Sequence, residues 1–322
     1  MKKEHGHLTL VPKTMCNEED PQLAGLFGQT SLRPEILSSA EFKKAVAFGA
    51  LQAECLVKKI LRGERIKLLT NDKPNDEKIG FNELLIRELN ARIEYYHPGI
   101  AGKYRIDDDV RLGGLVPSKA RDLKDLMYMY GVWLEGETKS IGTGSQDLLK
   151  ALEVASGAHY GLVHILHPFE GGNGRTGRAL LNGVLLIGAA ETRLGQEVRY
   201  PVPLLRTHEI DEVKMAADLE VGKEVKMDPY IKALMEVENT GDLGPFELHL
   251  ANAWVSDLKE RGVKLGRGSA LRRHRSRTDD FWLGVVDSRI DILEGFIERQ
   301  VAGRNEPHLI PDFFTSRHIR VA

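Results

Sequence analysis

The sequence predicts a mainly α-helical protein. Over long stretches its apolar residues recur every three or four positions, the spacing of one helix face, while the strict alternation typical of strands is scarce. The chain has 322 residues, of which 42% are hydrophobic and 29% charged, so it can bury a large core beneath a polar surface. Helices packed around such a core are therefore the expected architecture.

The predicted helices are separated by polar or proline-containing connections. Residues 62–78 are mostly polar and contain Pro74, which favours a connection, and His97-Pro98-Gly99 would end the helix that precedes it. The clearest apolar stripe lies in residues 40–61 and consists of Phe42, Val46, Ala50, Ala53, Val57 and Leu61. The expected helices cover residues 40–61, 81–95, 122–134, 146–166, 228–238, 245–259 and 282–301.

The overall charge gives no reason to expect a nucleic acid or a membrane as partner, because the formal net charge is only -2. Residues 1–13 lack the apolar run of a secretion signal, and no apolar stretch has transmembrane length. Cys16 and Cys55 are too few for a disulfide framework. We therefore expect a cytoplasmic protein. Delivery into another cell by a dedicated secretion system would leave none of these marks and stays open.

The stretch from His167 to Arg178, which reads HPFEGGNGRTGR, joins an imidazole to a glycine-rich loop. Glycines allow backbone N–H groups to converge on one oxyanion. Apolar residues at helical spacing follow, so the loop would open a helix whose unpaired amides and positive dipole end face the same anion. Arg175 and Arg178 would share one face of its first turn and contact different phosphates. The stretch predicts a polyphosphate site beside a proton acceptor.

A dinucleotide-binding fingerprint overlaps this stretch. Residues 172–177 match G-x-G-x-x-G, and residues 161–166 would have to form the strand before it. The match is short, and Pro201 and Pro203 suit a later parallel strand badly. A P-loop is excluded, because Arg178 and Ala179 stand where Lys and Ser or Thr are required. A dehydrogenase therefore remains a third interpretation.

The stretch also resembles the signature of the Fic (Fic/Doc) family, which runs His, any, Phe, any, acidic, Gly, Asn, Gly, Arg, any, any, Arg. Weaker similarity in residues 102–117 is to the family's β-hairpin flap, and residues 228–234 resemble the helix after its core. The resemblance implies a Fic-type helical bundle with a small β-hairpin flap. Residues 80–250 would form this core, 1–79 an N-terminal helical extension and 251–322 a C-terminal basic loop and helical element. The matching residues are His167, Phe169, Gly172, Asn173, Gly174, Arg175 and Arg178.

The resemblance implies a protein adenylyltransferase, which transfers AMP from ATP to a Ser, Thr or Tyr hydroxyl of a target protein. His167 would be the general base, a role that suits an imidazole with a pKa of ~6.5. Asn173 and Arg175 would be the other catalytic residues, and Phe169 would anchor the loop in the core. The phosphates would be bound by Gly172, Asn173, Gly174, Arg175 and Arg178.

The flap would hold the target protein by strand addition, a mode that relies on backbone hydrogen bonds. Val110, Arg111 and Leu112 are the residues expected to make this contact. Asp107, Asp108 and Asp109 would form a solvated turn beside it, while Tyr104 and Arg105 would be packing and surface residues around a turn.

Gly171 stands where the family pattern has an acidic residue that binds Mg²⁺, a cation that prefers oxygen ligands. Three alternatives follow. Glu170 substitutes as the metal ligand, the nucleotide brings Mg²⁺ with water and phosphate ligands alone, or the transferred group is UMP, phosphocholine or phosphate instead of AMP. A nucleotide-sensing or partner-binding scaffold with weakened catalysis is an alternative of another class.

Three further features bear on regulation and partners. The family often inhibits itself through a Glu that follows Ser or Thr by four residues and precedes Gly or Asn. The chain has no clean copy, and Glu54 is expected to be a surface residue, so self-inhibition or an inhibitory partner stays open. His159 and His164 do not have the spacing of a metalloprotease helix, so we expect no zinc site. Residues 261–277 hold seven Lys or Arg and no acid, but their glycines favour a flexible solvated connector over a nucleic-acid site.

Overall fold

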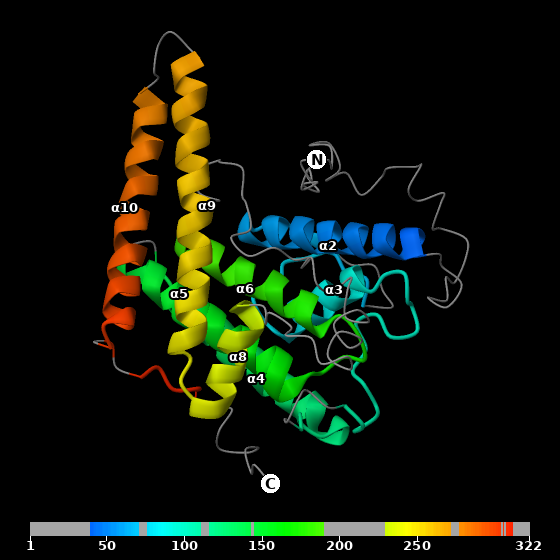
Figure 1. Ribbon diagram of the computed structural model, residues 1–322. Coiled ribbons are helices and arrows are strands. Elements are labelled where there is room, and N and C mark those ends of the chain that lie inside the picture. The colour runs from blue at the N-terminus through cyan, green and yellow to red at the C-terminus, as the bar shows by residue number, and fades with distance from the viewer. Residues whose placement is uncertain are drawn as a thin grey trace, which may run out of the picture.

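The computed structural model describes residues 39–70, 76–110, 116–142, 145–189, 229–271, 277–303, 305 and 307–311. These residues form a mainly α-helical fold, which confirms the predicted class (Figure 1). The helices are α2 (Ser39–Leu61), α3 (Glu83–Ile93), α4 (Leu123–Ser140), α5 (Ser145–Tyr160), α6 (Asn173–Ala189), α8 (Pro229–Thr240), α9 (Gly244–Leu271) and α10 (Arg277–Val301). A 3-10 turn over Ala120–Asp122 precedes α4, and a π-helix over Gly161–Leu166 follows α5.

Helix α6 is the central helix of the bundle. It packs against α5, α2 and α3, and the apolar side chains predicted to follow the glycine-rich loop are buried. Leu180, Leu181, Val184 and Leu185 are fully inaccessible to solvent. Polar residues of α6, among them Thr176 and Asn182, are also fully buried, so the helix is enclosed on more than its apolar face. Burial of α6 on several sides therefore holds the loop at its first turn rigidly against the core.

Most helix boundaries lie close to those predicted, and the differences have local causes. Helix α3 begins after Asn82, whose side chain accepts a hydrogen bond from the backbone N–H of Leu85 at 3.3 Å. Helix α4 continues past the predicted end at Leu134, where Thr138 hydrogen-bonds the carbonyl of Leu134 at 2.8 Å. Residues 161–166 are helical, so the strand that a dinucleotide-binding fold would need before the loop is absent there.

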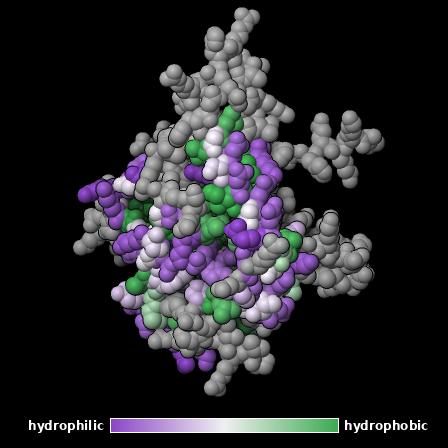
Figure 2. Space-filling model, turned by 90° about the vertical axis from the view of Figure 1, so that its left-hand side faces the viewer, coloured by the Kyte–Doolittle hydropathy of each residue, from purple (hydrophilic) through white to green (hydrophobic). Residues whose placement is uncertain are grey.

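Helices α9 and α10 form a long antiparallel pair (Figure 1). Trp254 and Leu258 on α9 and Leu293 on α10 are fully buried. The prediction of a flexible connector from residue 261 was wrong, because α9 continues to Leu271. Glycines lower helix propensity by only about 1 kcal/mol each, which the neighbouring α10 can offset. Figure 2 views the molecule from the α10 side and shows a strip of hydrophobic side chains between hydrophilic ones.

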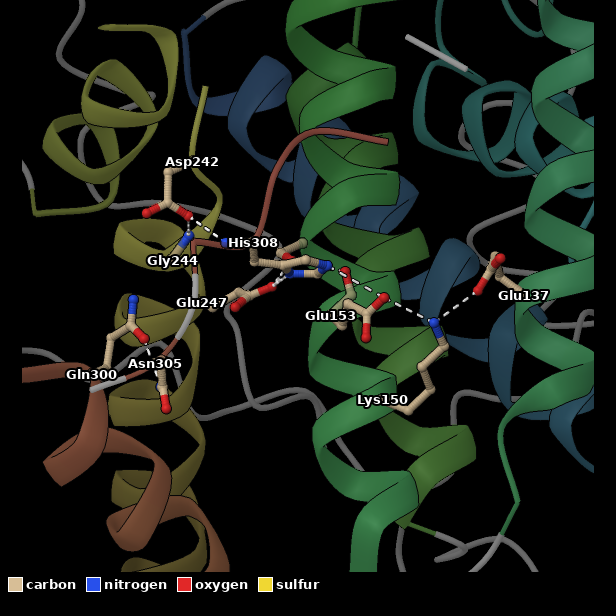
Figure 3. Close-up of polar contacts among 10 residues, drawn as sticks. Glu137, Lys150, Glu153, Asp242, Gly244, Glu247, Gln300, Asn305 and His308 are labelled. Atoms are coloured by element: carbon tan, nitrogen blue, oxygen red, sulfur yellow. Dashed lines mark hydrogen bonds and ion pairs between the residues drawn. The ribbon is translucent and has the colours of Figure 1, made fainter. Parts of the chain in front are cut away.

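The segment 307–311 returns from α10 to the core and is held beside the start of α9. Leu309 forms an isolated antiparallel β-bridge with Asp242. The backbone N–H of Leu243 donates to the carbonyl of His308 at 2.7 Å. The His308 ring lies between Glu247 of α9 and Glu153 of α5, with its Nε2 3.3 Å from Glu153 (Figure 3). We call residues 307–311 the C-terminal strap.

A chain of charges extends from the strap to α4. Glu153 also contacts Lys150 at 2.8 Å, and Lys150 contacts Glu137 of α4 at 3.0 Å (Figure 3). Burial by itself would lower the pKa of His308, but its bonds to Glu153 and Glu247 raise it to about 10. The bond from His308 lowers the pKa of Glu153 to about 2. His308 is therefore a charged imidazolium at neutral pH.

The described strands are short. β1 (Ile66–Lys67) pairs antiparallel with β2 (Asp76–Glu77) in the connection between α2 and α3. Within residues 102–110 and 116–119, the β-structure is a single bridge from Tyr104 to Phe169. Arg111 and Leu112 of the predicted flap lie outside the described residues. No helix in the described part of the chain is long and apolar enough to cross a membrane.

Candidate active site

His167 occupies a strained backbone position where α5 and its π-helix end. Its φ angle is 43°, and among the described residues it alone has positive φ without being glycine. The His167 N–H donates to the carbonyl of Leu162 at 2.9 Å, which completes the wide π turn. Non-glycine residues in this region cost of order 1–3 kcal/mol and π turns cluster at functional sites. The surroundings therefore hold His167 in a conformation that local preference disfavours.

The ring of His167 is oriented by its own helix. Nδ1 lies 2.8 Å from the carbonyl oxygen of Val163, which can only accept, so Nδ1 carries the proton and Nε2 is the free acceptor. Burial lowers the pKa of His167, and the charge of Arg105 lowers it further, although the bond to Val163 acts in the opposite direction. A neutral imidazole with a basic Nε2 is the state a general base requires.

Arg105 holds the backbone of His167 by a hydrogen bond, a role that the sequence analysis missed. The prediction of a surface residue is wrong, since Arg105 is only 3% exposed. Its Nε donates to the carbonyl of His167 at 2.8 Å, and its other nitrogens reach the carbonyls of Asp107 and Ser118. The sequence held no signal for this, because the contact joins residues 62 positions apart. Arg105 thus fixes the strained turn and links it to the start of the flap segment.

Asn173 and Phe169 shape the loop that follows. Phe169 is fully buried, as predicted for an anchor, and packs beside Tyr104 with ring centroids 5.8 Å apart. The Asn173 side chain accepts from the N–H of Phe169 at 3.0 Å and donates to its carbonyl at 2.7 Å. The same amide therefore closes the loop and caps it onto the first turn of α6.

The first turn of α6 faces the end of the loop. Gly172 has a φ of 72°, and a Cβ there would lie only 2.5 Å from an oxygen of Glu94, so this position requires glycine. The N–H of Thr176 donates to the carbonyl of Gly172 at 2.8 Å, and the N–H groups of a first helical turn point toward the N-terminal end of the helix, where an anion can bind. Asn90 also holds the loop in place. It is buried, and its side-chain amide donates to the carbonyl of Gly171 at 2.9 Å.

The two motif arginines contact different elements. Arg175 donates to Oε1 of Glu94 at 2.6 Å and lies 3.3 Å from the hydroxyl of Tyr96, just after α3. Arg178 is 1% exposed, and its guanidinium carbon lies 6.0 Å from the ring centre of Tyr230 on α8. Arg175 therefore lies partly exposed against Glu94 at the end of α3, whereas Arg178 is buried against α8.

Glu94 is the second residue that the sequence analysis missed. It follows α3, is 3% exposed, and its carboxylate lies against the glycines of the loop. Burial raises the pKa of Tyr96 to about 12, with Arg175 opposing and Glu94 adding to the rise, so the Tyr96 hydroxyl stays protonated beside this pair. Glu170, the carboxylate predicted from the motif, is exposed on the outer side of the loop.

His159 and His164 are not brought together with His167 in a metal cluster. His159 contacts the hydroxyl of Tyr230, and His164 stacks on Tyr160 with ring centroids 5.0 Å apart. Within the described residues, no group of three or more His, Cys, Asp or Glu side chains could hold a metal ion. Mg²⁺ bound with a nucleotide usually takes one or two carboxylates together with phosphate and water ligands, so it does not require such a cluster.

Comparison with known proteins assigns this region. The Fic/DOC family model matches residues 80–185, which confirms the resemblance carried by the motif. Protein adenylyltransferase Fic of Drosophila virilis is 31% identical over 199 residues, 57% of this chain and 39% of that protein. The proteins of the same name from Nematostella vectensis and Drosophila melanogaster are 36% and 39% identical over 102 residues. These matches cover 31% of this chain and 22% and 19% of those proteins, so the chain spans two fifths or less of its curated relatives.

Proposed function

We propose that this chain, which carries a Fic/DOC domain over residues 80–185, transfers AMP from ATP to a Ser, Thr or Tyr hydroxyl of a target protein. The relatives are named protein adenylyltransferase, and the residues matched by the family model include the stretch from His167 to Arg178. The observation that carries the proposal is the pairing of His167 with the first turn of α6. The Nε2 of His167, which is the acceptor of the ring, and the N-terminus of α6, which is suited to an anion, follow one another within one short loop.

The reaction needs one proton acceptor and a site for the leaving group. Nε2 of His167 would take the proton of the target hydroxyl as its oxygen attacks the α-phosphorus of ATP. The bond from that phosphorus to the bridging oxygen breaks, and pyrophosphate leaves with the electron pair. The amides of Gly172, Asn173 and Gly174 and the guanidinium of Arg175 would stabilise the charge on the phosphates.

Arg178 is buried, and its positive charge would attract the phosphates across the first turn of α6. Mg²⁺ bound with ATP would neutralise part of the triphosphate charge. Target recognition would use the flap, with Val110 at the edge of the described segment and Arg111 and Leu112 following it. Inhibition would come from a partner or from the chain itself. Glu54, the glutamate considered for self-inhibition, forms an ion pair with Lys58 at 2.6 Å on α2.

The proposal is tested with ATP labelled on its α-phosphate. The protein and its His167→Ala variant are incubated with Mg²⁺ and a cell lysate, and label on protein is measured after separation by electrophoresis. We expect label that depends on His167 and a loss of at least 10²-fold in the variant, the usual contribution of a general base. Parallel reactions with labelled UTP and CDP-choline identify transfer of another group. Absence of label with all three donors would contradict an enzymatic role.

A further inference from the structure

We infer that Glu94 supplies the carboxylate that the motif lacks at position 171, and that it holds the Mg²⁺ of the bound nucleotide. The inference rests on the proposed function, because it assumes a nucleotide at the first turn of α6. It assigns the metal ligand to the end of α3 in place of the loop itself, and in place of Glu170.

The Glu94 carboxylate lies within reach of position 171. A Cβ built on Gly171 would be 3.5 Å from the carboxyl carbon of Glu94 and 3.6 Å from its Oε2. These are distances that a longer acidic side chain at 171 could itself span. The carboxylate that the motif lacks is therefore present beside the loop, delivered by a residue 77 positions earlier in the chain.

The two oxygens of Glu94 have different surroundings. Oε1 accepts from Arg175 at 2.6 Å, and the carboxylate also has a hydrogen bond with the Tyr96 hydroxyl, so these two residues hold the side chain in place. Oε2 is the oxygen nearer to position 171. A carboxylate can accept from Arg at one oxygen and offer the other to a cation, because each oxygen has two lone pairs. Arg175 would thus orient Glu94 for the metal.

Electrostatics favours a cation between Glu94 and a bound nucleotide. A buried carboxylate beside an anion site repels phosphate strongly, because the local dielectric constant is low. Arg175 offsets one negative charge, whereas a triphosphate brings several. Mg²⁺ commonly binds through one or two carboxylates together with phosphates and waters. A single buried glutamate at this place therefore suits a shared metal, and exposed Glu170 would first have to be ordered.

The glycines of the loop allow the assignment to be tested by moving the carboxylate. A Cβ at Gly171 would meet Cδ1 of Ile100 at 3.2 Å, the flexible end of a side chain, so an aspartate fits there with a small adjustment. Gly172 cannot be used, because of its positive φ and its 2.5 Å approach to Glu94. The informative variants are Glu94→Gln, Glu94→Gln combined with Gly171→Asp, and Glu170→Gln as the matched control.

The experiment measures binding of α,β-methylene-ATP by calorimetry, once with Mg²⁺ and once with EDTA, and counts bound Mn²⁺ by electron paramagnetic resonance. We expect Mg²⁺ to tighten binding to the unaltered protein and to Glu170→Gln. In Glu94→Gln, the increase in affinity that Mg²⁺ causes should be smaller by roughly tenfold or more. Residues that only hydrogen-bond to metal ligands already account for roughly 10–100-fold in metal affinity. The combined variant should regain it. Thermal unfolding checks that each variant is folded.

The outcomes separate the inference from the proposed function. If Glu94→Gln binds the analogue more tightly and still gains equally from Mg²⁺, Glu94 is only the partner of Arg175 and the inference is wrong. Loss of the Mg²⁺ gain in Glu170→Gln alone would assign the metal to Glu170 and would also overturn it. If Glu94→Gln abolishes the gain while no His167-dependent label reaches protein, the metal assignment stands and the transferase proposal fails.

Discussion

At the scale of single residues, the geometry around His167 suits the general base that we propose. Its Nδ1 is tied to the carbonyl of Val163, and its carbonyl is tied to Arg105. These two bonds leave Nε2 unprotonated and fix where it points. Burial and the charge of Arg105 disfavour the imidazolium, so the ring remains neutral below the pH at which a free histidine becomes protonated.

The lowered pKa of His167 predicts the pH dependence of transfer. Protonation removes the base, and it requires a lower pH than the ordinary histidine value of 6.5. We expect the rate of label transfer at saturating ATP to stay constant from pH 8 to below 6.5 and to decrease only at lower pH. The measurement is an initial-rate series across this range with constant ionic strength. A decrease centred at or above pH 6.5 would show that the site does not disfavour the imidazolium.

At the scale of elements, the π-helix Gly161–Leu166 joins α5 to the loop and contains His164. The ring of His164 stacks on Tyr160, and its Nδ1 is buried without a hydrogen-bond partner. Burial, and secondarily the charge of His167, lower the pKa of His164 to about 4. The π-helix that precedes His167 therefore contains a buried histidine whose protonation the folded state disfavours.

His164 should make the fold less stable in mild acid. The unfolded chain binds a proton at His164 near pH 6.5, while the folded chain does so only near 4, so stability decreases as pH falls through this window. From pH 7.5 to 5 the loss due to His164 alone is expected to be about 2 kcal/mol, from the linkage between pKa shift and stability, and the comparison with a His164 variant isolates it from the opposite contribution of His308. Urea unfolding at both pH values tests this. His164→Phe should lose correspondingly less stability, and an equal loss in both proteins would exclude the effect.

At the scale of the whole molecule, the C-terminal strap connects distant parts of the chain. His308 links the strap to α9 through Glu247 and to α5 through Glu153, and Lys150 extends the chain of charges to α4 (Figure 3). Helix α5 continues past Glu153 into the π-helix that ends at His167. The strap therefore supports the helix that leads into the candidate active site.

The strap should stabilise the protein in a pH-dependent way. The pKa of His308 is raised in the folded state, so its contribution is complete below the unfolded value of 6.5 and is lost as pH rises through about 10. We expect His308→Gln to lower Tm clearly at pH 6 and much less at pH 10. Lys259→Gln, which breaks an exposed pair with Glu294, is the control and should change little at either pH. The same Tm difference at both pH values would contradict this account.

Features that depend on neighbouring residues could be predicted from the sequence, whereas features that depend on residues far apart in the chain could not. Helices α2, α3, α8 and α10 were predicted within a few residues, because their periodicity and caps are local. Helix α9 was predicted too short, since its glycines suggested a loop and the support from α10 is not visible in sequence. Arg105 was misplaced at the surface for the same reason: its partners are the carbonyls of Ser118 and His167.

The sequence by itself determined the match of residues 80–185 to the Fic/DOC family model, the helical class and the loop from His167 to Arg178, because each is encoded by neighbouring residues and their spacing. Only the tertiary structure decided which carboxylate lies beside Gly171, which aromatic ring covers Arg178 and which acids hold His308. Local spacing determines hydrogen bonds within a turn or helix. Contacts between residues tens of positions apart depend on how α3, α6, α8 and the strap pack, and that packing is settled by burial of the whole core.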